Sequence, residues 1–166
     1  MPSFNEEGAI KDMIESVQKH TAAFDTEIVV VDSSKDKTPE IAESLGARVI
    51  RQEPQGHGIA LRTAINEARN DIIITTDCDN TYPMDHIPRL LEIMKDGNYD
   101  LISCNRLNAQ LGREMPASNK LANKSFALMV RLLYGINAHD VSTGMFCMKR
   151  RVNDTISWET NYSFPC

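Results

Sequence analysis

The stretch IIITTDCDN, residues 72–80, indicates both a strand of the fold and a possible binding site. Its β-branched run predicts a buried strand that ends at two carboxylates one residue apart, Asp77 and Asp79. Residues i and i+2 of an extended chain point to the same side, so both carboxylates are expected to face one point. Two such charges repel unless a cation lies between them, and Mg²⁺ prefers oxygen ligands completed by water and phosphates. The pattern favours a metal–diphosphate site, with a solvated turn capped by Asp79 as the alternative.

Strands and helices are expected to alternate along the chain on both sides of this stretch. Apolar residues recur at helical spacing in three segments, for example at Ile10, Met13, Ile14 and Val17. Asn5 and Thr38 are expected to cap the first two helices. The expected helices are 6–20, 38–45, 58–68, 87–94 and about 119–134, and the expected strands are 27–32, 47–51, 71–76, 99–104 and 143–148. This alternation predicts an α/β fold with a mostly parallel sheet and helices on both faces.

The chain is expected to be a single domain, residues 1–166, because no repeat, low-complexity tract or linker interrupts the pattern. Residues 107–117 form the only long irregular stretch and are expected to be a mobile loop of the active site. No strand is expected before the first helix, and no closing element follows Pro165 and Cys166. The sequence therefore predicts a domain that lacks its first strand and is truncated at both ends.

Composition excludes several classes of function. The net charge of −5 argues against a nucleic-acid-binding protein, which would show a basic face. No run of 18 apolar residues and no signal-peptide pattern occur in the sequence, so no membrane span or secretion is predicted. The cysteines lack the spacing of zinc ligands and are expected to be reduced thiols of a cytoplasmic protein; they are Cys78, Cys104, Cys147 and Cys166.

Polar clusters follow three of the expected strands at their carboxyl ends. They are Asp32-Ser33-Ser34, Asp77 to Asp79, and Asn105-Arg106. Ligands of open α/β sheets bind at the carboxyl ends of strands, near a switch in strand order. The three clusters are therefore expected to meet at one edge of the sheet and to form one binding site.

Six motifs taken together resemble the family 2 glycosyltransferases of GT-A fold, and most closely the branch of dolichyl-phosphate mannose synthases and polyprenyl-phosphate glycosyltransferases. The motifs are PSFNEE (2–7), VVVDSSKDKT (29–38), QGHGIALRTAI (55–65), TTDCDNTYP (75–83), SCNRL (103–107) and HDVSTGM (139–145). They cover nearly the whole chain, in order. The resemblance implies an inverting, metal-dependent transfer of a sugar from a nucleotide-diphosphate donor to a polyprenyl or dolichyl phosphate. It also implies Mg²⁺ or Mn²⁺ as cofactor, and a location at the cytoplasmic face of a membrane.

The resemblance also assigns roles on the donor side of the site. Asp77 and Asp79 match the family's Asp-x-Asp metal motif. The other residues that match nucleotide-sugar-binding positions lie in three motifs: Pro2, Phe4 and Glu6 in the turn that holds base and ribose, Asp32 at the nucleoside, and Gly56 and Gly58 in a loop beside the nucleotide sugar.

On the acceptor side, Arg106 matches the family's Ser-Arg position, and Lys120 falls where a second basic group often binds the acceptor phosphate. Asp140 and Gly144 match a late Asp-x-x-x-Gly element near the sugar. The residues expected to take part in catalysis are Asp79, Arg106 and Asp140. A phosphate acceptor is already an anion and needs no strong base, whereas a hydroxyl acceptor would need one, for which Asp140 is the candidate.

The sequence departs from the family pattern at three positions. His57 stands where the loop between the glycines often carries Lys, and Arg62 is a candidate to compensate for that charge. Ser33 replaces a usual Gly. Thr81 replaces a Gln that often follows the second Asp, which leaves the third protein ligand of the metal open.

Three other functions remain alternatives at this stage. One is a glycosyltransferase that acts on a hydroxyl of a glycan or lipid. Another is a nucleotidyltransferase, although its first turn would be Gly-rich and basic, whereas residues 5–7 here read Asn-Glu-Glu. The non-enzymatic alternative is a receiver-like signalling domain, which would carry a Lys-Pro pair after a late strand; the sequence has none.

Overall fold

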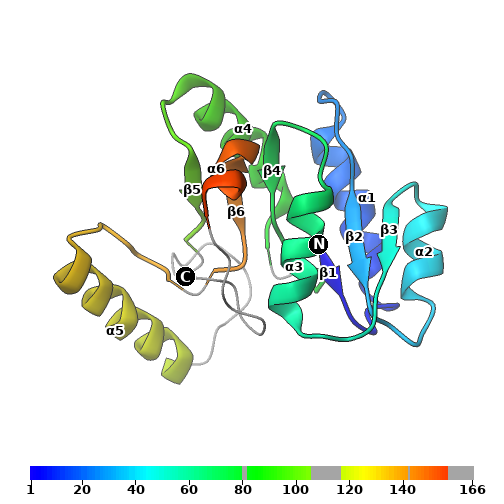
Figure 1. Cartoon of the computed structure of the whole chain (residues 1–166), viewed down its shortest axis with the longest axis horizontal. Helices are drawn as coiled ribbons and strands as arrows, with labels where there is room; N and C mark the ends of the chain where they lie inside the picture. Colours follow the sequence, from blue (N-terminus) through cyan, green and yellow to red (C-terminus); the bar gives the residue numbers. More distant parts are fainter. Residues whose placement is uncertain (80–81, 106–116, 142, 157–166) are drawn as a thin grey trace.

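The computed structural model describes residues 1–79, 82–105, 117–141 and 143–156, with side chains left out for 117–120 (Figure 1). Strands and helices alternate along most of this length. In chain order they are β1 Pro2–Ser3, α1 Ile10–Thr21, β2 Val29–Asp32, α2 Thr38–Ser44, β3 Arg48–Arg51, α3 His57–Glu67, β4 Ile72–Ile74, the 3₁₀ turn η1 Met84–His86, α4 Ile87–Asp96, β5 Leu101–Ser103, α5 Ala117–Tyr134, β6 Phe146–Lys149 and α6 Arg150–Thr155.

The described strands form two three-stranded sheets. In the first sheet β1, β2 and β3 are parallel in that order, with Val30 opposite Val49. In the second sheet β6 lies between β4 and β5 and is antiparallel to both, with Ile73 opposite Met148. The α/β class and the parallel arrangement are confirmed, and β6 is the antiparallel exception, which residue spacing alone did not indicate.

One hydrophobic core joins the two sheets. It contains Ile10, Met13 and Ile14 of α1, all fully buried, together with Val30 of β2 and Cys147 of β6. The apolar spacing that predicted the first helix therefore marks the face that it buries. Helix α1 contacts α2 and α4, whereas α3 lies against β1 and β2 and stands in front of the sheets in Figure 1.

The N-terminal residues differ from the sequence-based expectations in two respects, the presence of β1 and the start of α1. Pro2–Ser3 forms a two-residue strand paired with β2, so a strand does precede the first helix, too short for a periodic signal. Helix α1 begins at Ile10 rather than at residue 6, and Asn5 does not cap it. Asn5 has φ +56°, a left-handed conformation that asparagine tolerates, and its side chain accepts a hydrogen bond from the Lys35 N–H at 3.0 Å.

Thr38 also differs from its expected role as a helix cap. It is the first residue of α2, and its hydroxyl donates to Asp36 Oδ1 at 2.5 Å. The same hydroxyl accepts from the Glu6 N–H at 2.8 Å, so it links the loop after β1 to α2. The expected mobile loop at 107–117 lies almost wholly outside the described residues, as does Thr81.

Candidate functional site

A cavity of about 490 Å³ opens where β1, β2 and β4 end. Most of the predicted donor-side residues line it: Pro2, Phe4, Glu6, Gly56, Asp77 and Asp79. Ser33 and His57, which the sequence marked only as departures from a pattern, line it as well. The carboxyl ends of the strands thus meet at one site, as expected for an open α/β sheet.

Asp77, Cys78 and Asp79 come soon after β4 and all line the cavity, with a bend at Cys78 and Asp79. Asp77 and Asp79 face the cavity, and Asp79 is exposed to solvent. Cys78 is 2% exposed and belongs to the hydrophobic core. Burial raises the pKa of the Cys78 thiol to about 12, so this cysteine stays a neutral, apolar spacer. The small buried side chain anchors the turn while its neighbours present their oxygens.

Asp77 lies between two groups that fix its carboxylate. On one side, His57 Nε2 is 3.0 Å from Asp77 Oδ1. On the other, Gly144 approaches so closely that a Cβ added there would lie 3.0 Å from Asp77 Oδ2 and 3.0 Å from the Tyr82 hydroxyl. The Gly144 N–H donates to that hydroxyl at 2.6 Å. A side chain at position 144 would therefore crowd Asp77 and Tyr82, and each would have to move by a few tenths of an ångström.

The loops that follow β1 and β2 are linked by side-chain to backbone hydrogen bonds. The Asn5 N–H donates to Ser34 Oγ at 2.7 Å, and the Glu7 N–H donates to Asp36 Oδ2 at 3.3 Å. In return, Glu7 Oε2 accepts from the Lys37 N–H at 3.2 Å. Each of these bonds joins residues 29 or 30 positions apart, so the two loops satisfy backbone N–H groups of one another.

Asp32 is placed beneath the cavity rather than on its lining. It is 2% exposed, and its carboxylate accepts bonds from Ser3 Oγ at 2.7 Å, Ser34 Oγ at 2.6 Å and the Ser34 N–H at 3.0 Å. These hydrogen bonds replace the water that the buried carboxylate has lost. Its contact with a nucleoside stays a prediction, and its visible role is to hold the ends of β1 and β2 together.

Negative charge gathers at the cavity around Glu6. Burial raises the pKa of Glu6, and the carboxylates of Asp79, Asp36 and Asp77 raise it further. The Glu6 side chain therefore lies in a negative electrostatic potential that the neighbouring carboxylates produce. A bound cation would relieve this repulsion, whereas a bound anion alone would increase it.

Glu6→Gln is expected to raise the melting temperature at pH 7 in the presence of EDTA by roughly 1–2 °C. The raised pKa means that ionised Glu6 is disfavoured in the folded state, so the cost to stability grows as the pH rises above the ordinary glutamate pKa and is complete above the raised folded-state pKa. The gain should therefore vanish near pH 3.5, where the native glutamate is itself protonated. Differential scanning calorimetry at both pH values measures the effect, with the exposed Glu53→Gln as control. An equal gain at both pH values would contradict the electrostatic explanation.

The N-terminus of α3 faces the same cavity. Gly56, directly ahead of the helix, has φ +103° and lines the cavity together with His57. The left-handed backbone requires glycine, and no side chain caps this helix end. The first N–H groups of a helix and its dipole attract anions, and phosphate groups are frequent ligands there. The cavity thus combines carboxylates for a cation with a helix end for an anion.

The remaining predicted residues are not brought to the cavity lining by the described part of the chain. Gly58 is buried within the first turn of α3, and Asp140 is 5% exposed away from the lining. Lys120 lies in the first turn of α5, and its side chain is not described. Arg106 lies outside the described residues. Tyr82 was missed by sequence reasoning, since its contact with Gly144 joins residues 62 positions apart.

The donor atoms at the cavity fit a hard divalent cation held by few protein ligands. Asp77 and Asp79 offer carboxylate oxygens, which Mg²⁺ and Mn²⁺ prefer. Within the described ranges, no three or more His, Cys, Asp or Glu side chains are grouped so that they could enclose a metal. A cation there would take its other ligands from water and from substrate phosphates, as Mg²⁺ commonly does.

Two known proteins are similar in sequence to this chain over most of its length. The chain is 41% identical over 162 residues to a dolichyl-phosphate hexose transferase of Haloferax volcanii, covering 97% of this chain and 69% of the relative. It is 26% identical over 161 residues to a dolichol-phosphate mannosyltransferase of Pyrococcus furiosus, covering 92% of this chain and 46% of the relative. The chain therefore spans between about half and two thirds of these two relatives.

Solved structures show the same fold. Glucosyl-3-phosphoglycerate synthase of Mycobacterium tuberculosis, solved with Mn²⁺ and UDP-glucose, aligns with a TM-score of 0.70 at 24% identity, over 91% of this chain and 55% of that one. Mannosyl-3-phosphoglycerate synthase of Rubrobacter xylanophilus aligns with a TM-score of 0.69 at 22% identity, over 91% and 52%. Both likenesses establish the GT-A architecture. The sequence model of glycosyl transferase family 2 matches residues 1–157, and the chain belongs to this family.

Proposed function

We propose that this domain transfers a hexose from a nucleoside-diphosphate donor to a polyprenyl or dolichyl phosphate, with inversion at the anomeric carbon. The observation that carries the proposal is the cavity in which the Asp77–Asp79 pair lies beside the N-terminus of α3. A nucleoside diphosphate with a divalent cation matches both features, because the cation meets the carboxylates and the phosphates meet the helix end. The exposed Phe4 ring at the cavity offers a surface for the base.

In the proposed reaction the acceptor phosphate oxygen attacks the anomeric carbon, the bond from that carbon to the diphosphate breaks, and the nucleoside diphosphate leaves. Mg²⁺ or Mn²⁺ held by Asp77 and Asp79 would neutralise charge on the leaving diphosphate. The residues of this chain bind and orient: His57 holds Asp77, and Arg106 and Lys120 are proposed to position the acceptor phosphate. The acceptor is already ionised, so no general base is required.

Two observations support a lipid-linked acceptor: the names of similar proteins and the surface of helix α5. The Haloferax volcanii and Pyrococcus furiosus relatives carry dolichyl and dolichol phosphate in their names. Helix α5 lies apart from both sheets in Figure 1, carries no acidic residue, and includes Lys124 and Arg131. Its exposed apolar side chains, together with that of Ile136 just beyond, are Leu121, Phe126, Leu128, Met129, Leu132, Leu133 and Tyr134. A basic helix with this surface is suited to lie on an anionic lipid interface.

No described helix has the length and apolarity needed to cross a bilayer. The exposed apolar side chains of α5 are the ground on which a surface position at the membrane is proposed for this helix. The free thiols of Cys78, Cys104 and Cys147 are consistent with a reducing compartment, which supports the cytoplasmic face of that membrane.

Transfer of radiolabelled hexose from UDP- and GDP-sugars to dolichyl phosphate, with Mn²⁺ or Mg²⁺ present, tests the proposed function. Product should form with dolichyl phosphate, and EDTA should abolish it. Dolichol, which has a hydroxyl in place of the phosphate, is the matched control acceptor. Transfer to dolichol or to a free glycan, with none to dolichyl phosphate, would replace this proposal by the hydroxyl-acceptor alternative.

The double variant Leu132→Glu, Leu133→Glu is expected to weaken binding to anionic lipid vesicles at least roughly tenfold. Each leucine is about three quarters exposed, 76% and 75%, and burying one in lipid is worth about 1.5–3 kcal/mol. Vesicle co-sedimentation measures the effect. Lys11→Glu on α1 changes the net charge by a similar amount and should bind far more tightly than the double variant. Equal binding of the two would show that α5 does not contact lipid.

A further inference from the structure

Helix α5 leads toward the candidate site through a short segment that begins at Gly135. This glycine has φ +67°, and its N–H donates to the Arg131 carbonyl at 3.0 Å. Glycine adopts this left-handed conformation without strain and commonly ends helices in this way. Further along the chain, the Gly144 carbonyl accepts from Thr75 Oγ1 at 2.8 Å, just beyond β4. The segment therefore runs from the end of a helix to a point that is tied to the sheet beside the cavity.

The side chain of Arg131 folds back over this segment. Its Nε donates to the Ala138 carbonyl at 2.6 Å, and its Nη2 lies 2.5 Å from His139 Nδ1. Because a guanidinium can only donate, the imidazole nitrogen accepts and carries no proton. The Ala138 N–H donates to the Ile136 carbonyl at 2.8 Å, which folds the segment into a tight turn. These bonds join the last turn of α5 to residues 135–139, and we call the contacts of the guanidinium the Arg131 brace.

Arg131 lies on the face of α5 that is turned toward the protein. Asn123 and Ala127 come eight and four residues before it, and both are buried, at 8% and 4% exposed. Residues four positions apart share one face of a helix. Leu132 and Leu133, which follow Arg131 directly, are instead exposed. The Arg131 brace therefore leaves free the apolar surface that is proposed to contact lipid.

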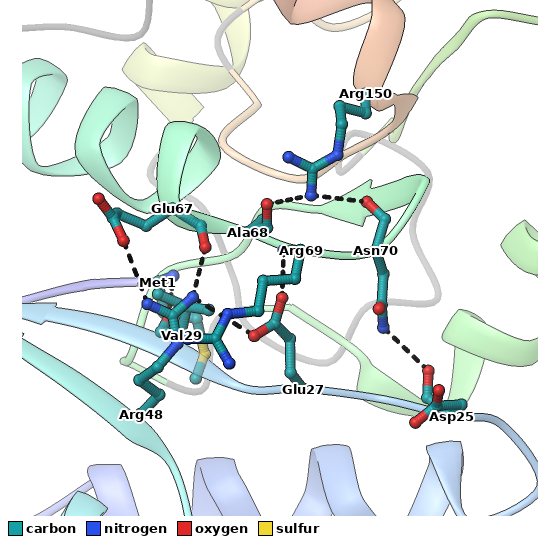
Figure 2. A network of polar contacts seen from close by, with 10 residues as sticks. All are labelled: Met1, Asp25, Glu27, Val29, Arg48, Glu67, Ala68, Arg69, Asn70 and Arg150. Carbon is teal, nitrogen blue, oxygen red and sulfur yellow. Dashed lines mark hydrogen bonds and ion pairs between the residues drawn. The ribbon is translucent and has the colours of Figure 1, made fainter.

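The elements that carry the donor side are fixed by a different set of contacts, at the end of α3 away from the cavity (Figure 2). Arg48 of β3 contacts Glu27, ahead of β2, at 3.3 Å and Glu67 of α3 at 3.2 Å. Arg150 of α6 donates to the Asn70 carbonyl, between α3 and β4, at 3.2 Å. These contacts fix α3 relative to β2 and β4, and none of them involves α5. Loss of the Arg131 brace should therefore leave the donor side of the cavity unchanged.

A lipid phosphate makes a geometric demand that a soluble acceptor does not make. Its apolar chain is held in the bilayer, so its phosphate stays at the membrane surface. Transfer requires the reacting atoms to come within contact distance in a defined orientation. If α5 rests on the lipid surface, the joint between α5 and the sheets sets the height and tilt of the cavity above that surface. A loose joint would spread the cavity over many positions, whereas a fixed joint would keep it within reach of the phosphate.

We propose that Arg131 is a positioning residue that fixes the lipid-facing helix α5 relative to the cavity, so that the phosphate of a membrane-bound acceptor reaches the donor sugar. The proposal rests on the function proposed above. Arg131 acts through Ala138 and His139 rather than on the reacting atoms. Its loss should therefore matter for an acceptor held in a membrane and not for an acceptor in solution. A merely structural role would lower transfer to both acceptors alike.

Arg131→Met, assayed with two acceptors, tests the proposal. One acceptor is dolichyl phosphate in vesicles of phosphatidylcholine and phosphatidylglycerol, at a vesicle concentration that binds all of the enzyme. The other is citronellyl phosphate, a short isoprenyl phosphate that stays in solution. With dolichyl phosphate kcat should fall roughly tenfold, whereas kcat with citronellyl phosphate and the KM of the donor should stay within about twofold. Saturation with vesicles separates this effect from weaker lipid binding caused by the lost charge.

Two further variants accompany Arg131→Met. His139→Leu keeps the charge of α5 and removes one acceptor of the brace, so it should give a smaller loss, again with dolichyl phosphate alone. The double variant should lose no more than Arg131→Met, because both changes break the same contact. Arg89→Met on α4 is the matched control, since Arg89 pairs with Glu92 at 3.2 Å on an exposed surface. It should alter transfer to neither acceptor.

Equal losses with the two acceptors would overturn the proposal, as would an unchanged kcat with dolichyl phosphate. Hydrogen exchange tests the joint without any transfer: the Ala138 amide should exchange roughly tenfold faster in Arg131→Met, while the Ile73 amide of β4 should not change. Unchanged exchange at Ala138 would contradict the Arg131 brace. If the original chain transferred hexose to neither acceptor, the proposed function would fail, and the exchange result would still decide whether Arg131 fixes the joint.

Discussion

Asp77→Asn and Asp79→Asn are each expected to lower the rate of hexose transfer by at least roughly 100-fold, the largest loss foreseen for single substitutions in this chain. The two carboxylates face one cavity, and in the proposed reaction each would contribute a negative oxygen to the cation that balances charge on the leaving diphosphate. Asparagine keeps the shape of the side chain but not its charge. Initial rates over a series of Mn²⁺ concentrations measure the effect, and the apparent affinity for the metal should fall together with kcat.

The stability of the same variants separates the electrostatic role from damage to the fold. Removing one of two neighbouring carboxylates relieves repulsion, including that felt by Glu6, so the melting temperature in EDTA should hold or rise. Asp12→Asn, on the exposed face of α1, is the matched control and should leave transfer unchanged. Full activity in both site variants would refute the assignment of Asp77 and Asp79.

Gly144→Ala is expected to lower kcat by roughly 10- to 100-fold, the second large effect. The added Cβ would stand 3.0 Å from Asp77 Oδ2 and from the Tyr82 hydroxyl, closer than carbon and oxygen normally approach. The carboxylate is the more mobile neighbour, so it should give way by a few tenths of an ångström. Catalysis depends on the exact placement of such groups, so this displacement is expected to lower kcat. The melting temperature should fall by only a few degrees, because overpacking at one methyl costs about 1–3 kcal/mol.

Gly8→Ala provides the control for Gly144→Ala. A Cβ at Gly8 would meet no atom within 4 Å, and the residue lies in the loop before α1. Steady-state kinetics and calorimetry on both variants compare the same chemical change at a crowded and an open position. A Gly144→Ala enzyme with normal kcat would show that Asp77 does not depend on the empty space at position 144.

Local patterns were sufficient to predict most of the helices and strands and the position of Asp77 and Asp79, whereas the other donor-side residues followed from the family resemblance. The spacing of Ile10, Met13 and Ile14 identified a buried helix face, and the run at 72–76 ending in Asp77 placed the carboxylates at a strand end. Both predictions rest on side-chain periodicity, which is a property of neighbouring residues. Side-chain periodicity depends only on the local backbone conformation, so these features could be predicted without knowledge of tertiary contacts.

Features that depend on distant residues could not be predicted in the same way. The antiparallel direction of β6 follows from pairing with β4, more than 70 positions away, and strand direction leaves no mark on side-chain spacing. Asn5 was expected to cap a helix, but a hydrogen bond from Lys35, 30 positions on, holds it in a left-handed turn. Asp32 likewise finds its Ser3 partner only when β1 and β2 pair.

The hydrogen bonds that link the loops after β1 and β2 limit how this site can diversify. Asn5 and Glu7 are held by Ser34, Asp36 and Lys37, so neither loop keeps its shape without the other. An insertion or a graft in one loop alone would leave backbone donors of the second without acceptors. We expect donor preference to be exchangeable between relatives only when residues 4–9 and 32–38 are transplanted as a pair, which makes the two segments one inherited module.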